Sequence, residues 1–465
     1  MIRLFERDLL PENTTIFGYA RTKMDQKEFH DRIAPNLKTQ KEDTKQKFLD
    51  ICRYVPGAYD EAEAFQNLNK EIEEVEKKRG GDGCNRIFYL ALPPNVFASV
   101  SEQLKKNCYA ESGVNRVVIE KPFGKDLESC QELIDGMKKL WSEKETFRID
   151  HYLGKEMVKN ILPFRFSNPL VDMSLNNKTV ANVQITFKEK FGTEGRGGYF
   201  DEFGIIRDIQ QNHLCQVFCL LAMDTPKSFD AEAIRDQKVK LLKETKPIST
   251  DEVLLGQYTA ANGKPGYKDD DTVPKDSNTP TFAAMVLHID NDRWRGVPFI
   301  IKAGKALDEG KVDIRVQYKE PEQQMVAEVA RNELVLRVQP DEAIYVKSNT
   351  KLPGQDSASV PAELDLTYSK RFKNMYIPEA YEALILDCIQ GRHSNFVRDD
   401  ELLASWAIFT PLLHAIDEGK VPYTTYPYGS CGPEKLNEFV AKFGYQYDKN
   451  YVWPETDVAK YADKI

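Results

Sequence analysis

The chain has 465 residues, 41% of them hydrophobic, which is enough for two or three domains with buried cores. Its 64 basic and 73 acidic residues give a formal net charge of −9. General nucleic-acid or anionic-membrane binders normally carry a basic excess or a basic run, and this chain has neither. No stretch approaches the roughly 18 apolar residues of a membrane span, and acidic residues come too early for a secretory signal. Any anionic ligand must therefore be held by a local cluster of cations.

The eight cysteines are scattered and contain no CxxC pair. This spacing argues against a zinc ribbon or a thioredoxin-type site, and no metal site is expected. Cys215 and Cys219 lie on one face of a predicted apolar helix, where two buried thiols are the simplest interpretation. A reducing cytoplasm fits this cysteine usage best.

The first 150 residues alternate between predicted strands and helices. Strands are predicted over 14–19, 86–92 and 116–119, and helices over 26–52, 67–78, 96–106 and 127–141. Apolar strands separated by helices indicate a parallel sheet covered on both faces. A dinucleotide-binding domain begins with a strand, a glycine-rich turn and a helix, but this region has no GxGxxG and begins with what resembles the tail of a helix. We therefore expect an incomplete Rossmann-like domain that lacks its first βα unit.

Beyond about residue 175 the hydrophobic pattern changes to the period of two typical of strands. Strands are predicted over 179–191, 282–289, 297–301, 312–318 and 333–338, and helices over 379–390 and 400–418. This pattern indicates an antiparallel sheet with one solvated or partner-facing side. The polar, proline-rich segment 262–280 is expected to be an exposed loop. The predicted fold class is α/β followed by α+β, with domains at 1–150 and 151–465.

The segment EKPFG places Glu120 and Lys121 directly after a predicted parallel strand that Pro122 ends. Ligands of open α/β sheets bind at the carboxyl ends of the strands, so Lys121 would point into a binding crevice. A charged residue that only ends a strand is an equally good interpretation of this segment alone.

In the segment RIDHYLGKE, the strand-like residues Arg148 and Ile149 run directly into Asp150, His151 and Tyr152. His151, Tyr152 and Lys155 offer several hydrogen-bond donors suited to phosphate. Each could be a solvated loop residue, but the density of polar groups makes that interpretation weaker. The segment lacks the GxxxxGK[ST] frame of a P-loop.

A glycine-rich stretch over 192–204 leads into a predicted helix that becomes apolar after His213. A histidine at the polar end of a buried helix suits a general base, although a lone core histidine is the commoner case. Such a base needs a carboxylate behind its ring. Asp208 lies five residues earlier, about 140° around an ideal α-helix, and so is poorly placed. Asp150 is the best candidate for this carboxylate.

Together these segments resemble the glucose-6-phosphate dehydrogenase family. The resemblance rests on EKPFG, RIDHYLGKE and GTEGRGGYFDEFGIIRD with QNHL, and it continues through FIIKAGKAL, RNELVLRVQP, ELDLTY, FTPLLH and YGSCGP. It covers about residues 2–453. Enzymes of this family oxidise carbon 1 of glucose 6-phosphate to 6-phospho-glucono-1,5-lactone and pass the hydride to NADP, the first step of the oxidative pentose phosphate pathway.

The resemblance assigns roles to single residues. It makes His213 the general base and Asp150 the residue that orients it. The positions that match substrate-binding residues are His151, Tyr152 and Lys155 at the phosphate, Lys305, Glu189 and Asp208 at the sugar, Gln339 as a further contact, and Lys121 between substrate and nicotinamide. Arg21 and Thr22 follow the strand where the family binds the adenosine 2′-phosphate, and a guanidinium there favours NADP over NAD.

Some members of the family hold a second, structural NADP. The matching positions are Lys302, Lys311, Arg315, Arg337, Tyr345, Lys347, Asp365, Leu366, Thr367, Tyr447 and Trp453. Three positions depart from the pattern of the family. Cys431 replaces an arginine in YGSRGP, Gly310 stands where some members have a substrate-side arginine, and Phe97 replaces a tyrosine near the coenzyme. Each change removes a hydrogen-bond donor.

The phosphate-binding turn of the family, of the form GASGDLAKKK, would precede Met1 and is not in the sequence. The amides at the start of a helix bind the pyrophosphate there, so we expect the chain as written to bind NADP poorly. The alternative to an enzyme of this family is a non-catalytic short form that binds sugar phosphate or assembles with a full-length partner. The family forms dimers and tetramers through its large sheet, so a homodimer or tetramer is expected, with no nucleic-acid or membrane partner.

Overall fold

The computed structural model describes residues 1–39, 41–79, 84–321, 330–351 and 359–447. The chain forms two compact units. The first comprises residues 1–154 together with two later segments, 228–235 and 378–403, and the second comprises residues 155–227, 236–377 and those from 404 onward. The domain division proposed from the sequence, at 150/151, does not include the two segments that return to the first unit.

The first unit is built on parallel strands. β1 (Ile16–Ala20) pairs with β2 (Cys52–Pro56), and β3 (Arg86–Leu90), β4 (Asn115–Ile119) and β5 (Thr146–Arg148) form a separate sheet. Helices α4 (Ala62–Lys78), α5 (Phe97–Asn107) and α6 (Leu127–Lys138) connect them. The parallel α/β arrangement and its predicted strands are confirmed, whereas β2 was not predicted and only the end of β5, at Arg148, was described as strand-like.

Two details of the first unit differ from the predictions. The expected long helix over 26–52 is wrong: α2 (Gln26–Ile33) runs into a short 3₁₀ turn (Ala34–Asn36), and α3 begins only at Glu42. Pro35 lies in that turn, and proline has no amide hydrogen to continue an α-helix. Helices were also expected to cover both faces of the parallel sheet. This is wrong for β3, the edge strand, because its Ile87 and Tyr89 side chains are 40% and 39% exposed.

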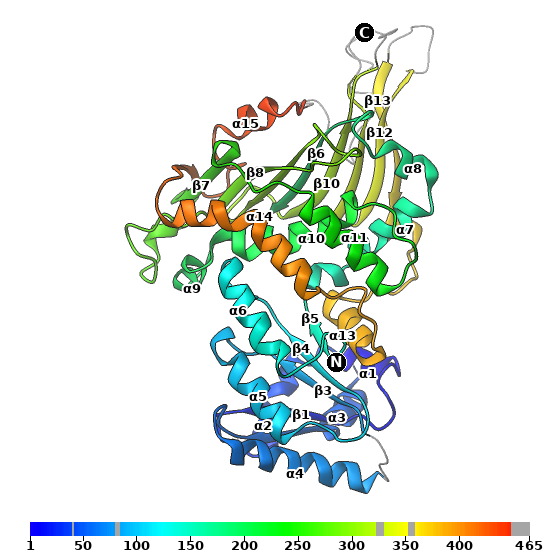
Figure 1. Cartoon of the computed structure of the whole chain (residues 1–465), viewed down its shortest axis with the longest axis vertical. Helices are drawn as coiled ribbons and strands as arrows, with labels where there is room; N and C mark the ends of the chain where they lie inside the picture. Colours follow the sequence, from blue (N-terminus) through cyan, green and yellow to red (C-terminus); the bar gives the residue numbers. More distant parts are fainter. Residues whose placement is uncertain (40, 80–83, 322–329, 352–358, 448–465) are drawn as a thin grey trace. The chain divides into compact units, whose positions relative to one another are not determined.

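Segment 378–403 completes the core of the first unit. Helix α13 (Ala380–Gln390) lies beside β4 and β5 (Figure 1), and Arg116 of β4 donates through Nη1 to the carbonyl oxygens of Cys388 and Ile389, both at 2.7 Å. Leu384, Cys388 and Phe396 pack with residues of β4 and β5 in one buried apolar cluster. The helix expected over 379–390 is therefore confirmed, and it belongs to the α/β unit.

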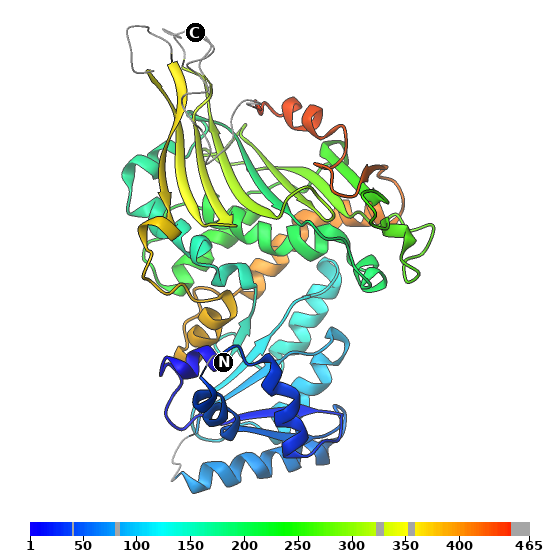
Figure 2. The same ribbon diagram turned by 180° about the vertical axis from the view of Figure 1, so that it is seen from behind.

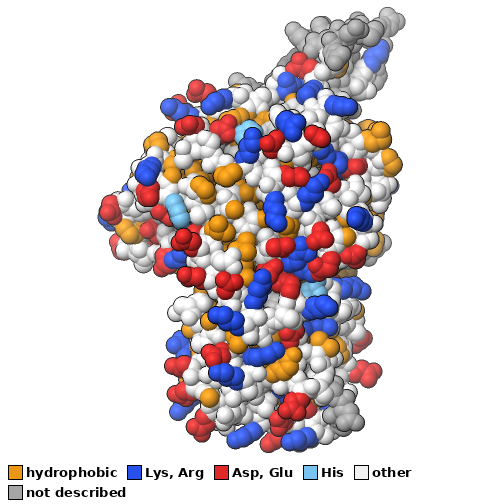
Figure 3. Space-filling model, in the orientation of Figure 1, with side chains coloured by type: hydrophobic (Ala, Val, Ile, Leu, Met, Phe, Trp, Pro, Cys, Tyr) orange, Lys and Arg blue, Asp and Glu red, His pale blue; other side chains and the backbone are white. Residues whose placement is uncertain are grey.

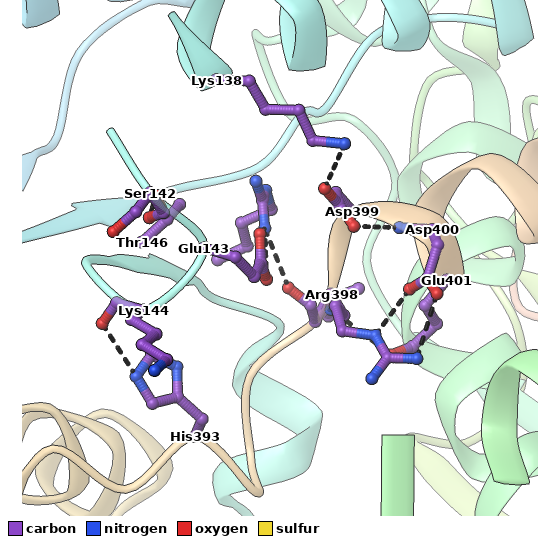
Figure 4. A network of polar contacts seen from close by, with 12 residues as sticks. Lys138, Ser142, Glu143, Lys144, Thr146, His393, Arg398, Asp399, Asp400 and Glu401 are labelled. Atoms are coloured by element: carbon purple, nitrogen blue, oxygen red, sulfur yellow. Dashed lines mark hydrogen bonds and ion pairs between the residues drawn. The ribbon is translucent and has the colours of Figure 1, made fainter. Parts of the chain in front are cut away.

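A network of ion pairs and hydrogen bonds attaches the end of this segment to the same unit (Figure 4). Lys138 Nζ lies 2.6 Å from Asp399 Oδ2, and Arg398 Nε lies 2.7 Å from Asp400 Oδ1. The ring of His393 contacts the carbonyl oxygen of Lys144 at 3.1 Å. The contacts of Lys138 with Asp399 and of His393 with Lys144 join residues more than 200 positions apart in the chain.

The second unit is built on one nine-stranded sheet. Its strand order is β13-β12-β11-β10-β6-β9-β8-β7-β14. The strands are β6 (Val180–Lys188), β7 (Val253–Thr259), β8 (Phe282–His288), β9 (Pro298–Gly304), β10 (Lys311–Tyr318), β11 (Glu333–Gln339), β12 (Ala343–Lys351), β13 (Ser359–Thr367) and β14 (Tyr423–Pro427). All neighbours are antiparallel except the pairs β6–β9 and β7–β14. The α+β prediction is confirmed, whereas β7, β12, β13 and β14 were not predicted.

Most helices of the second unit lie along one face of this sheet, whereas α15 (Leu436–Lys442) packs on the other face, where Val440 contacts Val286 and Ile300. α7 (Glu156–Phe166) and α10 (Cys215–Ala222) lie behind the sheet in Figure 2, where β10 to β13 form a broad surface with no described helix across them. Every residue of α10 is buried, including Cys215 and Cys219, so both thiols are core groups as predicted. The helix expected over 400–418 is also present, as α14 (Asp399–Asp417).

The segment predicted as an exposed loop, 262–280, is only partly exposed. Tyr267, Val273 and Ser277 within it are buried, and Thr281 follows it with no exposed surface. The prediction of an exposed loop is therefore only partly right, because several residues of this polar segment pack inward.

The surface carries charges of both signs. Lysines and arginines are interspersed with aspartates and glutamates on the face shown in Figure 3. Among the described helices, none has the length and apolar character needed to cross a bilayer.

Candidate active site

The EKPFG segment follows β4 at the carboxyl end of the parallel sheet, as predicted. Glu120 accepts a hydrogen bond from the hydroxyl of Tyr89, on β3, at one carboxylate oxygen. The hydroxyl of Tyr381, on α13, donates to the other oxygen at 3.4 Å. Burial, followed by the hydrogen bond to Glu120, raises the pKa of Tyr89, so this phenol is a donor at neutral pH. Two tyrosines therefore fix the backbone turn that carries Lys121.

The segment after β5 forms a short 3₁₀ turn over His151–Gly154. Asp150 is 3% exposed and accepts a hydrogen bond from the backbone amide of Tyr152 at 2.9 Å. The ring of Tyr381 is parallel to that of His151, with planes 10° apart and centroids 5.8 Å apart. Asp150, His151 and Tyr152 are thus held in one tight turn whose imidazole is supported by an aromatic ring.

Gly154 explains how closely α13 approaches this turn. A Cβ atom at Gly154 would lie 2.4 Å from the carbonyl oxygen of Ala380, the first residue of α13. A side chain at this position would therefore push the helix away, and with it the ring of Tyr381. The glycine of the RIDHYLGKE segment has a packing reason as well as any role in binding.

His213 lies on a π-helix (Ile206–Leu214) that continues directly into α10, and it is 1% exposed. The predicted α-helical geometry is wrong for this segment. Hydrogen bonds of a π-helix join residues five apart, so residues 208 and 213 are one turn apart. The angle of about 140° between Asp208 and His213, which was calculated for an ideal α-helix, therefore does not apply. Single π-helical turns occur frequently at functional sites.

Asp208 contacts Lys305, a residue that the sequence placed near the sugar. Lys305 Nζ lies 2.6 Å from Glu189 Oε2 and 3.8 Å from Asp208 Oδ2. The same ammonium lies 5.3 Å from the centre of the Phe200 ring and 5.7 Å from that of Phe191. We call these five residues the Lys305 cluster.

Strand pairing explains why Glu189 and Lys305 meet. Each residue directly follows a strand, β6 and β9 respectively, and these two strands are parallel neighbours with Lys188 opposite Gly304. The amide of Glu189 also donates to the carbonyl oxygen of Gly304 at 2.9 Å. Carboxylates beside an ammonium offer both acceptors and donors, which is the chemistry needed to hold sugar hydroxyls.

Lys155 and Gln339 form a second polar pair in the same unit. Lys155 Nζ donates to Gln339 Oε1 at 2.8 Å, joining the residue before α7 to the end of β11. Burial lowers the pKa of Lys155, and Glu342 opposes this effect. The two predicted substrate contacts are therefore adjacent. Asp150 was expected to orient His213, and His151 and Tyr152 were expected to bind the phosphate together with Lys155. Both expectations join residues of different units and stay predictions.

The residues predicted to select the coenzyme lie after β1. Arg21 and Thr22 are both exposed, and the Arg21 guanidinium lies 5.3 Å from the centre of the Tyr59 ring. The hydroxyl of Tyr54 donates to the carbonyl oxygen of Thr22 and fixes this turn. An exposed guanidinium above an aromatic ring is a suitable site for a phosphate beside a base.

Most residues predicted for a second coenzyme site lie on β9 to β13. Cross-strand pairing puts Lys302 opposite Thr186, Asp313 opposite Arg337, and Tyr345 opposite Asp365. Asp313 is 1% exposed, and it lies 3.2 Å from Lys311 Nζ and 3.0 Å from Arg315 Nε. Burial alone would raise the pKa of Asp313, but Arg315, Lys311 and Lys302 lower it below its ordinary value.

The other residues predicted for the second coenzyme site differ in their exposure and in the face of the sheet on which they lie. Lys347 is buried and pairs across strands with Glu333 and Glu363, whereas Tyr447 is 66% exposed. Asp365 and Thr367 share one face of β13, so Leu366 between them lies on the opposite face by strand alternation. Trp453 lies outside the described residues.

Sequence reasoning missed Tyr89, Tyr381 and Phe200, which support the predicted site residues from the side. No short motif marks them. The presence of a tyrosine in the otherwise apolar strand pattern RIFYLAL was the available signal for Tyr89, and nothing comparable distinguished Tyr381 in a predicted helix.

Two family models match the chain along almost its whole length. The model described as glucose-6-phosphate dehydrogenase, NAD binding domain, matches residues 1–160, and that described as glucose-6-phosphate dehydrogenase, C-terminal domain, matches residues 162–448. The chain is 54% identical over 462 residues to glucose-6-phosphate 1-dehydrogenase of Emericella nidulans, covering 97% of this chain and 90% of the relative. It is 51% identical over 464 residues to that of Saccharomyces cerevisiae, covering 97% and 92%.

Solved structures agree with these relatives. A structure of glucose-6-phosphate dehydrogenase in complex with its substrate glucose 6-phosphate matches with a TM-score of 0.93 and 50% identity, covering 96% of this chain and 94% of that one. Glucose-6-phosphate 1-dehydrogenase from Mycobacterium avium matches with a TM-score of 0.82 and 28% identity, covering 97% and 95%. The chain belongs to the glucose-6-phosphate dehydrogenase family.

Proposed function

We propose that the chain oxidises glucose 6-phosphate at carbon 1 to 6-phospho-glucono-1,5-lactone, with hydride transfer to NADP. The observation that carries this proposal is the Lys305 cluster, in which Asp208 is supplied by the same π-helix that bears His213. Its acceptors and donors suit sugar hydroxyls, and a buried histidine one helical turn away from Asp208 suits a general base. This reaction is the first step of the oxidative pentose phosphate pathway.

In this reaction His213 takes the proton of the hydroxyl at carbon 1 while the hydrogen on that carbon leaves as hydride. Asp150 orients the imidazole and stabilises the imidazolium that forms. His151, Tyr152 and Lys155 bind the phosphate, with Gln339 beside Lys155. NADP, when bound, supplies the hydride acceptor. Lys121 lies between the sugar and the nicotinamide, on the turn that Tyr89 and Tyr381 fix through Glu120.

The coenzyme is NADP in preference to NAD. Support comes from Arg21, whose exposed guanidinium above Tyr59 can make paired hydrogen bonds to a 2′-phosphate but has no equivalent partner in NAD. Thr22 lies beside it, on the turn that Tyr54 fixes.

A second, structural NADP binds on the sheet of the second unit. Support comes from the concentration of charge there: Lys311 and Arg315 pair with buried Asp313, and Arg315 also pairs with Glu333 at 3.1 Å. These cations are held in place before any ligand arrives.

The chain assembles as a homodimer or tetramer and acts in the cytoplasm. Support for this location comes from a 50% identical relative from Arabidopsis thaliana, which is named as cytoplasmic.

The alternative, a non-catalytic form that binds sugar phosphate or joins a full-length partner, is not favoured. The similarity to enzymes of this family extends through both family domains, and relatives are matched over about nine tenths of their length. A purely structural role would not require His213, Asp150 and Lys121 in place.

The test is reduction of NADP by the purified chain when glucose 6-phosphate is supplied. We expect turnover, and we expect His213→Asn to reduce kcat by roughly 10²- to 10⁴-fold while glucose 6-phosphate still binds in calorimetry. His288→Asn, the same change at a histidine paired with Glu252 outside the site, is the control and keeps activity. Binding without turnover in the unmodified chain would support the non-catalytic alternative, and full activity of His213→Asn would refute the base assignment.

A further inference from the structure

The glycine-rich loop (residues 192–204) that precedes the π-helix is held by a second loop, residues 266–281, which we call the clasp. The clasp belongs to the segment expected to be exposed, yet Tyr267 has no exposed surface and Ser277 is 8% exposed. Both side chains bind one carboxylate, that of Asp201 at the end of the short helix α9 (Gly197–Asp201). The clasp therefore contacts the loop through a specific acceptor.

Asp201 accepts hydrogen bonds from three hydroxyl groups of the clasp. The hydroxyl of Tyr267 donates to Asp201 Oδ1 at 2.6 Å, and that of Ser277 donates to the same oxygen at 2.5 Å. The hydroxyl of Thr279 donates to the backbone carbonyl oxygen of Asp201 at 2.9 Å. Burial, followed by the hydrogen bond to Asp201, raises the pKa of Tyr267, so its proton stays in place across the accessible pH range.

Backbone amides of the glycine-rich loop donate to the clasp in turn. The amide of Gly197 donates to Asp270 Oδ2 at 3.2 Å, and that of Gly198 donates to Thr272 Oγ1 at 2.8 Å. A Cβ atom at Gly197 would lie 2.5 Å from Asp270 Oδ2, so glycine permits this close approach. The amide of Ile205, the residue before the π-helix, donates to the carbonyl oxygen of Pro280 at 3.0 Å.

The clasp also reaches the Lys305 cluster. Phe200, the neighbour of Asp201, contacts the Tyr267 ring edge-to-face at 6.0 Å and lies below the Lys305 ammonium at 5.3 Å. The amide of Lys305 donates to the carbonyl oxygen of Thr281 at 3.0 Å. Asp201 and the clasp thus connect to the cluster through one aromatic ring and one backbone bond.

We propose that Asp201 is a positioning residue for the sugar-binding site. Its carboxylate holds α9 against the clasp, which keeps Phe200 under Lys305 and fixes the start of the helix that carries Asp208 and His213. This inference rests on the proposed function, since it assigns Lys305 and Asp208 to the sugar. Asp201 itself acts through its neighbours and not by contact with substrate.

The test compares Asp201→Ala with Asp201→Asn in the full chain. Alanine removes the acceptor, whereas the amide oxygen of asparagine can accept the same two hydroxyls. We expect Asp201→Ala to raise KM for glucose 6-phosphate about fivefold to thirtyfold, because Phe200 and the start of the π-helix are no longer held against the clasp, and to leave KM for NADP within about twofold. Asp201→Asn should restore most of the affinity. Asp276→Ala, at an exposed aspartate of the clasp, is the matched control.

Hydrogen exchange gives a readout that does not depend on activity. Asp201→Ala should accelerate exchange at the amides of Gly197, Gly198 and Ile205, and Asp276→Ala should not. Tyr267→Phe and Ser277→Ala, which each remove one donor, serve if Asp201→Ala fails to fold and should give smaller changes in the same direction. A lower unfolding temperature with unchanged KM and unchanged exchange would overturn the proposal. If the unmodified chain shows no turnover but Asp201→Ala and Asp276→Ala give the expected exchange pattern, the proposed function is refuted, whereas the role of Asp201 in holding α9 against the clasp is supported.

Discussion

Tyr381 joins two segments of the candidate site, because its ring is parallel to that of His151 and its hydroxyl donates to Glu120. Glu120 precedes Lys121 in the chain, and His151 belongs to the turn expected to bind phosphate. Helix α13, which supplies Tyr381, reaches this turn from more than 200 residues away in sequence. A residue that is remote in the chain therefore sets the orientation of one that the sequence identified.

We expect Tyr381→Ala to raise KM for glucose 6-phosphate about threefold to tenfold, because the loss of an aromatic pair costs about 0.5–1.5 kcal/mol. Tyr381→Phe keeps the ring and removes only a long hydrogen bond, so its KM should stay within about threefold of the unmodified value. Steady-state kinetics with both substrates checks this, with KM for NADP as the internal control. Equal effects of the two variants would show that the hydroxyl, and not the ring, orients His151.

Arg21→Ala tests the choice of coenzyme. A hydrogen bond to a charged group contributes about 1.5–3 kcal/mol, so the variant should raise KM for NADP roughly tenfold to a hundredfold. KM for NAD should change little, because NAD has no 2′-phosphate for the guanidinium to bind. Lys23→Ala removes an exposed cation two residues away and is the control. An equal rise for both coenzymes would mean that Arg21 shapes the turn and does not read the phosphate.

Glu189 and Lys305 were predicted from the family resemblance and not from strand patterns, because the strand predicted over 179–191 contains Glu189 and the one over 297–301 ends before Lys305. In the structure each directly follows a strand, and those two strands are parallel neighbours. The buried helix around His213, in contrast, was clear from its apolar run. Its π-helical form was not predictable, because a single extra residue per turn leaves no distinct pattern over nine residues.

Residues that act through long-range contacts could not be predicted from local patterns. Strands β12 and β13 carry many polar residues, among them Lys347, which lies opposite Glu333 and Glu363 on the neighbouring strands, so period-two alternation of apolar residues is weak. The clasp has the polar composition of a solvent-exposed loop, but Tyr267 is buried beside the rings of Phe200 and Tyr258 and bonds, like Ser277, to Asp201. In each case the partner is distant in sequence.

Lys302 offers a pH-dependent test of the second coenzyme site. Burial lowers its pKa from 10.5 to about 7, although nearby Asp313 raises it. Since the folded-state pKa is below the unfolded value, the unfolded chain holds more protons between pH 7 and 10.5, and this lysine makes stability rise with pH across that window. A bound phosphate would favour the ammonium form and raise the pKa again.

Binding of NADP at this site should therefore take up close to one proton at pH 8 and much less at pH 6, where Lys302 is already charged. Affinity for the second NADP should fall as the pH rises above 7, because protonation of the lysine then costs free energy. Calorimetry in two buffers of different ionisation enthalpy measures this uptake. Lys302→Met should abolish it, while Lys264→Met, at an exposed lysine elsewhere in the unit, should not. If calorimetry shows that each chain binds only one NADP, without proton uptake at pH 8, and that Lys302→Met does not change this binding, a coenzyme site beside Lys302 is ruled out.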